Sequence, residues 1–290
     1  MPNPAFLALL PLLAAEPPAP PTVPLKFAWP ARLRCEVEQK MAFDHHGKGA
    51  PSDTSMRLAL EAVREGAGWR VREKVLESTP KGKMDPRELE VLLFPPFRVT
   101  KDGAFGGLDL TPEDKTILEK RQATEDQKAE IAKKLDPTFA AMAREDLLAN
   151  ATKRATSAWT FLVAAWAGKD LPPGDVPWLR TERNQPFPLI GIVHVVDRLK
   201  VSPGAACSPS PRGGCVKVEI TSSPDLTTGG VPVPGPDVAP GVPRDTRFQL
   251  TQTLLTDPRT LVPRSVTRTS EVETPAEHIT VVDSTTYRCK

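Results

Sequence analysis

Histidine and cysteine are the residue types in this chain whose chemistry stands out, and there are four of each. His45 and His46 are adjacent and follow Asp44 in a predicted turn, whereas His194 lies in a predicted strand and His278 at the start of another. A zinc site needs three or four convergent ligands, and neighbouring side chains in an extended turn point apart. We therefore expect a solvated turn at the first two histidines, a surface position for His194, and no metal site.

The sequence carries no motif of nucleophilic or phosphate chemistry. It has no Gly-x-Ser-x-Gly elbow, and no Ser or Cys is tied by spacing to a His and an acid. The glycine-rich stretch Gly103–Gly107 lacks the Lys-Ser/Thr ending of a phosphate-binding loop. We therefore expect a non-catalytic protein without a cofactor. A hydrolase is one alternative, and it requires His194 or His278 to meet an acid and a nucleophile.

The even number of cysteines is typical of an oxidising compartment, in which cysteines are paired. Three pairings are possible, and we favour Cys207 with Cys215 and Cys35 with Cys289. The first pair would close a short loop rich in Pro and Gly. Cys35 and Cys289 each share a face with the apolar residues of an alternating strand, so adjacent antiparallel strands would bring them within bridging range. The first and last strands are therefore predicted to be neighbours.

The N-terminal region is predicted to direct export. Residues 1–15 have the apolar core and the small terminal residues of a secretory signal peptide, and residues 16–30 form a predicted Pro-rich linker outside the core. Residues 31–290 are then a single domain with no stretch that could span a bilayer. The balance of 38 basic and 36 acidic residues argues against nucleic acid as a partner. We expect a periplasmic or secreted protein.

Alternating apolar and polar residues predict antiparallel strands on both sides of a central helical stretch. Arg32–Phe43, Met56–Ala62 and Trp69–Leu76 form a predicted meander, and a slip in the pattern at Val75-Leu76 indicates a bulge or a wet interior. A Pro- and Gly-rich stretch, residues 224–244, is predicted to be an exposed loop. The later strands are expected over Leu189–Val201, Cys215–Ile220, Thr246–Leu255, Leu261–Val272 and Ile279–Cys289.

Residues 112–168 are the long helical stretch of the chain. Thr111-Pro112 is a strong start signal, and the run that follows is rich in helix formers but poor in apolar residues, which predicts a solvated first helix. A second start signal at Asp136-Pro137 opens a helix with one apolar stripe, for which Asn150 is the weak point and Gly168 the stop. The last turns of this helix carry two tryptophans. These turns either pack against the sheet or line a cavity for an apolar ligand.

The order of these elements resembles that of exported proteins in which a strongly curved antiparallel sheet carries a helical lid, such as the periplasmic lipoprotein carriers. The similar parts are the meander over Arg32–Leu76, the helical insertion over 112–168 and a late hairpin around Asp257-Pro258-Arg259-Thr260. The resemblance implies an α+β fold, a half-barrel-like antiparallel sheet with a central insertion of two or three helices. The predicted disulfides and the Pro-rich loop depart from that family.

We expect an exported binding protein that holds an apolar or lipid-like ligand between helix and sheet, or that binds an envelope protein. A cell-surface structural or assembly protein, which would act through its faces and its Pro-rich loop, is the alternative beside the hydrolase. The residues expected to line the ligand site are Trp159, Leu162, Trp166, Leu58, Leu60 and Leu250.

Overall fold

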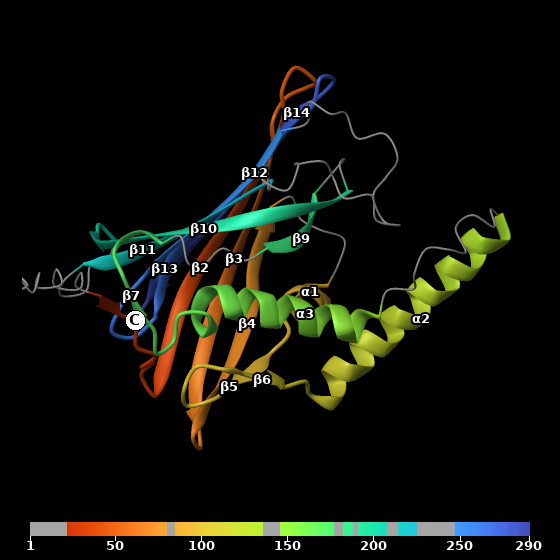
Figure 1. Cartoon of the computed structure of the whole chain (residues 1–290). Coiled ribbons are helices and arrows are strands. Elements are labelled where there is room, and N and C mark those ends of the chain that lie inside the picture. Colours follow the sequence, from red (N-terminus) through yellow and green to blue (C-terminus); the bar gives the residue numbers. More distant parts are fainter. Residues whose placement is uncertain are drawn as a thin grey trace, which may run out of the picture.

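The computed structural model describes residues 22–79, 85–135, 146–176, 182–187, 191–207, 214–224 and 247–290. In these ranges, one large curved antiparallel sheet carries three α-helices on one of its faces (Figure 1). This arrangement confirms the predicted α+β class. The predicted signal peptide, residues 1–15, lies outside the described residues, as does the predicted Pro-rich loop apart from Pro224, the last residue of a strand.

Twelve described strands form the sheet: β2 (Arg32–His45), β3 (Ser52–Glu65), β4 (Gly68–Thr79), β5 (Phe97–Val99), β6 (Phe105–Leu108), β8 (Gly174–Val176), β9 (Glu182–Phe187), β10 (Gly191–Ala205), β11 (Cys215–Pro224), β12 (Arg247–Thr256), β13 (Pro263–Glu273) and β14 (His278–Cys289). Their spatial order is β6-β5-β4-β3-β2-β14-β13-β12-β11-β10-β8, and β9 also pairs with β10. The first and last long strands, β2 and β14, are therefore neighbours near the middle of the sheet.

The predicted meander of the first three long strands is confirmed. β2 pairs with β3, and β3 pairs with β4, over most of their lengths. The register of β3 and β4 shifts after Leu58↔Val75, so that Leu76 has no partner on β3. This is the predicted bulge, and it leaves the Leu76 side chain 53% exposed.

Both predicted disulfides are present. Cys35 and Cys289 are register partners of β2 and β14, with Cα atoms 3.9 Å apart, and their bridge spans 254 residues of sequence. The bridge of Cys207 and Cys215 spans only 8 residues and lies where β10 and β11 begin to pair. Two disulfides are compatible with a protein that folds outside the cytoplasm.

The two faces of the sheet differ in chemistry. We call inner face the one that packs against the helices; near the middle of the sheet it carries buried Val37, Leu58 and Tyr287 on three adjacent strands. The opposite, outer face carries ion pairs between adjacent strands, such as Arg57 with Glu36 at 2.8 Å. Alternation along each strand produces this division, because successive side chains of a strand point to opposite faces.

The predicted linker over residues 16–30 is wrong for its described part. Residues 22–31, here called the strap, pack into the core, with Leu25 and Trp29 buried. The backbone N–H of Leu25 donates to the Lys169 carbonyl at 2.8 Å, and that of Ala28 donates to the Thr260 carbonyl at 3.2 Å. Within the strap, β1 (Val23–Pro24) pairs with β7 (Asp170–Leu171) in a separate small sheet. The strap therefore joins the end of the helical insertion to the turn between β12 and β13.

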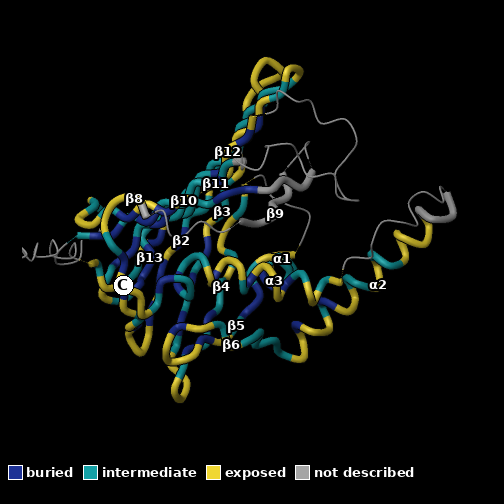
Figure 2. Tube along the Cα trace, in the orientation of Figure 1, coloured by how far each residue is buried: buried dark blue, intermediate teal, exposed yellow. Residues whose placement is uncertain are grey.

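The helices are α1 (Pro86–Leu93), α2 (Pro112–Leu135) and α3 (Leu147–Trp159), and a π-helical turn, Thr160–Ala164, extends α3. The start predicted at Asp136-Pro137 lies outside the described residues; α3 begins after the capping residue Asp146. In α2, Leu118 of the second turn is buried. The later turns project from the body of the protein and bear exposed and half-buried residues (Figures 1 and 2). This agrees with the prediction that the first helix is solvated.

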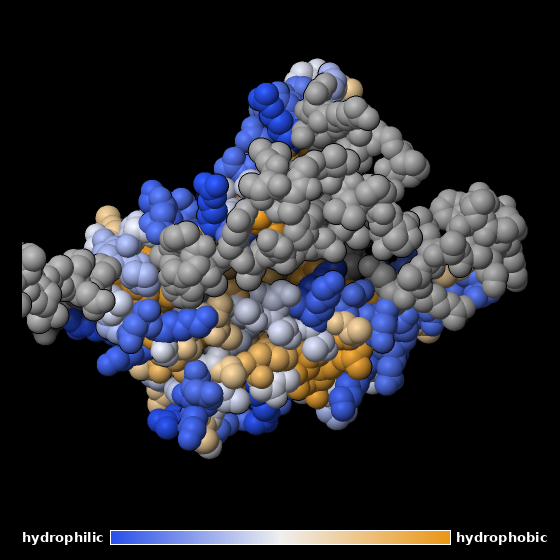
Figure 3. Space-filling view, viewed as in Figure 1, coloured by the Kyte–Doolittle hydropathy of each residue, from blue (hydrophilic) through white to orange (hydrophobic). Residues whose placement is uncertain are grey.

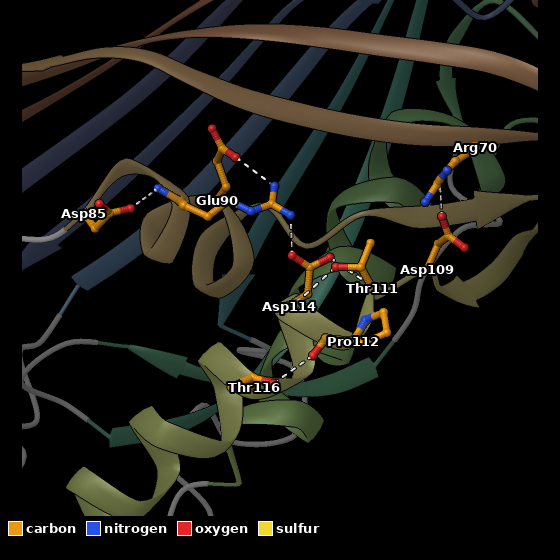
Figure 4. Close-up of polar contacts among 9 residues, drawn as sticks. Arg70, Asp85, Glu90, Asp109, Thr111, Pro112, Asp114 and Thr116 are labelled. Atoms are coloured by element: carbon orange, nitrogen blue, oxygen red, sulfur yellow. Dashed lines mark hydrogen bonds and ion pairs between the residues drawn. The ribbon is translucent and has the colours of Figure 1, made fainter.

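A network of polar contacts fixes the start of α2 to the sheet (Figure 4). Thr111 and Asp114 form a reciprocal capping box: the Thr111 N–H donates to Asp114 Oδ2 at 2.9 Å, and the Asp114 N–H donates to Thr111 Oγ1 at 3.2 Å. Arg87 of α1 bridges Asp114, which is fully buried, and Glu90. Glu90 in turn accepts the N–H of Val75 in β4 at 2.9 Å. The base of the projecting helix is thereby tied to α1 and β4.

Candidate functional site

Most of the residues expected to line a ligand site belong to the main core. Leu58, Leu60, Trp159 and Trp166 are buried, and Leu162 is half-buried against the same cluster. They position the helix rather than face an opening, because aromatic residues of the strap and of β5 pack between α3 and the sheet.

Trp159 shows how this part of the core is filled. Its side chain is only 2% exposed, and its indole N–H donates to the Gly103 carbonyl at 2.8 Å. The Trp159 ring meets the rings of Trp29 and Phe97, with centroids 5.2 and 5.4 Å away. Such tilted and edge-to-face contacts are favourable geometries for aromatic rings. The tryptophan-bearing end of α3 is therefore an anchor for the helix, and Trp29 comes from the segment predicted to be a linker.

Leu250, the remaining predicted residue, lies elsewhere. It belongs to a second buried apolar cluster, with Val195, Phe248 and Val272, on strands β10, β12 and β13. We call the surrounding region the upper inner face. On β2 it comprises the inner-face residues from Gln39 to His45. On β14, β13, β12 and β11 it comprises the residues that the strand pairing places in line with them. It is the part of the inner face that lies toward the β2–β3 turn, away from Trp159.

Large apolar side chains of β2 are exposed in this region. Met41 is 43% exposed and Phe43 is 39% exposed, and they point to the same side of β2 because they are two residues apart. Phe43 pairs with Val281 across β14, and Val281 pairs with Ser270 across β13. The next residue of this row is Leu250. An apolar row with one hydroxyl thus leads from the exposed Phe43 to the buried second cluster.

Charged and amide groups accompany the apolar row. Asp283 accepts a hydrogen bond from the Gln39 amide at 3.3 Å and is the register partner of Arg268. Arg268 is exposed, and no ion pair joins it to another described residue. On the far side of the region the Ser222 hydroxyl donates to Asp197 at 2.5 Å. The upper inner face is therefore amphipathic, and its guanidinium group is free to meet an anion.

A half-buried acid lies on the inner face closer to the helices. Glu73 of β4 alternates with Val71 and Val75 and pairs with Leu60, so its neighbours are apolar. Burial raises the pKa of Glu73 to about 7. Burial also raises the pKa of Tyr287, and the carboxylates of Glu73 and Asp283 add to that effect.

Three of the four histidines gather at the end of the sheet formed by the β2–β3 and β13–β14 turns. The imidazole rings of His46 and His278 are stacked, with centroids 4.0 Å apart and planes at 26°. His46 Nδ1 lies 3.4 Å from Asp44 Oδ2, and His278 Nε2 lies 3.0 Å from Glu271 Oε1. His45 points to the opposite face of β2. We call the stacked rings and their two carboxylates the histidine pair.

The prediction of an isolated solvated turn at the first two histidines is thus incomplete, because β14 brings His278 beside His46. Their backbones are hydrogen-bonded, with the His46 N–H donating to the His278 carbonyl at 3.0 Å. His194 lies apart from them in β10, opposite Asn184 of β9. The sequence does hold a signal for the histidine pair. If Cys35 and Cys289 are direct partners, counting along both strands from them places His46 opposite His278.

Thr280, His46 and Asp44 are arranged in the order of the nucleophile, base and acid of a catalytic triad. The Thr280 hydroxyl lies 3.0 Å from His46 Nε2, and Asp44 lies beside Nδ1. In a hydrolase, such groups act where water is excluded and where preorganised donors meet the developing negative charge. Here the His46 side chain is 42% exposed. The arrangement therefore supports binding through ring nitrogens better than it supports nucleophilic catalysis.

No described helix is long and apolar enough to cross a membrane. Among the same residues, no group of three or more His, Cys, Asp or Glu side chains is placed to hold a metal ion. No known protein family matches the chain, and no curated protein is similar to it in sequence.

Proposed function

We propose that this chain is a non-catalytic extracytoplasmic protein that binds an apolar, lipid-like ligand on its upper inner face. The observation that supports the proposal most directly is the exposure of Met41 and Phe43 on the face that elsewhere forms the core. A large apolar side chain gains about 1.5–3 kcal/mol when it is fully buried, so a ligand that covered both would gain from each.

The ligand we expect is an amphiphile with a negatively charged group. Its apolar part would lie along Phe43 and Val281, and its charged group would lie at Arg268. Arg268 suits this role because it is exposed in the same region and a guanidinium group binds carboxylate or phosphate oxygens in a fixed fork. An extracytoplasmic location agrees with the two disulfides and with the predicted signal peptide.

Two fluorescent probes test the proposal on the full chain. Phenylnaphthylamine is apolar and neutral, and anilinonaphthalene sulfonate is apolar and anionic. We expect both to bind the parent chain. Exchange of Met41 and Phe43 for Ser should weaken both probes by about tenfold, which corresponds to roughly 1.4 kcal/mol. Arg268→Gln should weaken the anionic probe alone.

Leu76→Ser is the matched control, because Leu76 is also a large exposed apolar residue but lies on the bulge of β4. It should leave both affinities unchanged. Equal loss of affinity in the Leu76 control and in the double variant would contradict the proposal, as would probe binding that no substitution changes. Circular dichroism of each variant shows whether the sheet is intact.

A protein that acts through protein contacts is the second candidate, and the helical insertion favours it. α2 projects from the body, and its Ile131 is 59% exposed (Figure 1). Figure 3 shows hydrophobic side chains gathered below α3, beside the first turns of α2. A chain with Ile131→Ser and without residues 224–244 should lose a protein partner but keep probe affinity. Loss of probe affinity alone in the Met41 and Phe43 variant favours the first candidate.

A further inference from the structure

We propose that His46 and His278 form a two-histidine binding site for a transition-metal dication such as Ni²⁺, Cu²⁺ or Zn²⁺. His46 directly follows β2 and His278 begins β14; the His46 N–H donates to the His278 carbonyl, and the two ring centroids are 4.0 Å apart. Neutral imidazole is a good ligand for these three metals, whereas Mg²⁺ and Ca²⁺ prefer oxygen ligands. This inference does not depend on the ligand proposed for the upper inner face.

The carboxylates beside the two rings leave one lone-pair nitrogen on each ring. A carboxylate only accepts hydrogen bonds, so the N–H of His46 is assigned to Nδ1, which faces Asp44, and the N–H of His278 is assigned to Nε2, which faces Glu271. His46 Nε2 and His278 Nδ1 then carry the lone pairs. The Thr280 hydroxyl, 3.0 Å from His46 Nε2, agrees with this tautomer because it can donate to that nitrogen.

The two carboxylates suit the second shell of a metal site. A histidine that binds a metal commonly donates its other ring N–H to a carboxylate, which fixes the ring and makes the ligand nitrogen more basic. Glu271 is hydrogen-bonded to His278 Nε2 at 3.0 Å, and the Asp44 carboxylate lies 3.4 Å from His46 Nδ1. Both acids also add negative charge beside the ion. His45 is outside this set, because it points to the other face of β2 and lies 3.9 Å from Glu277.

Two protein ligands and water complete the coordination that we propose. A metal–nitrogen bond is about 2.0–2.1 Å long, so the two ligand nitrogens must approach to about 3 Å of each other. Both side chains are partly exposed, at 42% and 37%, and can turn about their side-chain bonds to reach that separation. A site with only two protein ligands is expected to be weaker than a structural zinc site, which has four.

Isothermal titration of the full chain, free of any polyhistidine tag, with NiCl₂ tests the proposal. We expect one Ni²⁺ ion per chain near neutral pH. His46→Ala and His278→Ala should each abolish measurable binding at this site. Glu271→Gln keeps both ligands but removes one orienting carboxylate, so it should weaken binding by about tenfold. His45→Ala is the matched control and should leave the affinity within about twofold of the parent value.

Equal Ni²⁺ binding in the His46→Ala, His278→Ala and parent chains would overturn the proposal, and so would the absence of heat in the parent chain. One ion per two chains would also overturn it, because it would indicate an ion held between copies. Circular dichroism excludes unfolding as the cause of any loss.

Discussion

Cys35 and Cys289 are direct partners on β2 and β14, and their disulfide joins the first long strand of the sheet to the last. The bridge links residues 254 positions apart, so it restricts the unfolded chain far more than the bridge between Cys207 and Cys215, which links residues 8 positions apart. The loop-entropy model gives at most about 5.5 kcal/mol for the long bridge and about 2.5 kcal/mol for the short one.

Removal of the long bridge is therefore expected to destabilise the protein more than removal of the short one. The comparison uses the Cys35→Ser/Cys289→Ser chain and the Cys207→Ser/Cys215→Ser chain, each in urea unfolding followed by circular dichroism. We expect the midpoint to fall further for the first chain. A larger loss for the second chain would show that native-state contacts, rather than chain entropy, dominate the effect of both bridges.

The same pairing contains the histidine pair. His46 follows Cys35 by eleven residues, and His278 precedes Cys289 by eleven residues. The sequence analysis predicted that these two strands are neighbours, from the alternation of their residues and the parity of the cysteines. His278 was considered apart from His45 and His46, so its contact with His46 was not predicted. Strand adjacency was thus predictable, whereas side-chain contacts required the register to be followed residue by residue.

The strap provides a second prediction, because the structure places it in the core. Leu25→Ala should cost about 2–5 kcal/mol of unfolding free energy, as is typical when a buried Leu is truncated. Lys26→Ala is the control, since the adjacent side chain is exposed and its truncation should change the free energy by less than about 0.5 kcal/mol. Similar small effects of both substitutions in urea unfolding would contradict a core position for the strap.

The strap also shows why proline content alone gave the wrong prediction of a linker. Prolines are frequent just before the strap and occur within it at Pro24 and Pro30, and such composition is typical of an extended linker. Yet Leu25, Phe27 and Trp29 alternate with Lys26 and Ala28, as in a strand with one buried face. An extended segment can be a strand of the core if its apolar side has a surface to cover. That surface, formed by α3 and the sheet, is built from distant residues and is not visible in a local window.

The anchor of α2 leads to a third prediction. Asp114 is fully buried, caps the helix and pairs with Arg87, so Asp114→Ala should remove a cap and leave a guanidinium group without that partner. Loss of a cap costs about 0.5–2 kcal/mol, and the loss of one of the two carboxylate partners of Arg87 adds to the cost. Hydrogen exchange should become faster in the first turns of α2. Glu113→Ala, an exposed change in the same turn, should leave exchange nearly unchanged, and equal effects of the two substitutions would contradict the anchoring role.

The half-buried acid Glu73 leads to a fourth prediction, on stability and pH. In the folded protein its pKa is about 7, whereas the ordinary value is 4.5. Between these two values the folded state holds a proton that the unfolded chain has released, so the free energy of unfolding falls as the pH rises. Below about pH 4.5 the effect vanishes, and above about pH 7 it is complete. The shift corresponds to at most about 3 kcal/mol, because each pKa unit is worth about 1.4 kcal/mol and the side chain is only half-buried.

Glu73→Gln removes the charge and keeps the shape of the side chain. At pH 8 we expect the variant to be more stable than the parent chain, by up to about 3 kcal/mol, while at pH 4 the two should unfold at similar urea concentrations. Glu119→Gln, an exposed change on α2, is the control and should follow the parent at both pH values. A constant difference between the Glu73 variant and the parent at pH 4 and pH 8 would show that the carboxyl group titrates alike in the folded and unfolded chains. The pH-dependent difference that we expect would instead show that the inner face holds this partly buried acid at a cost in stability.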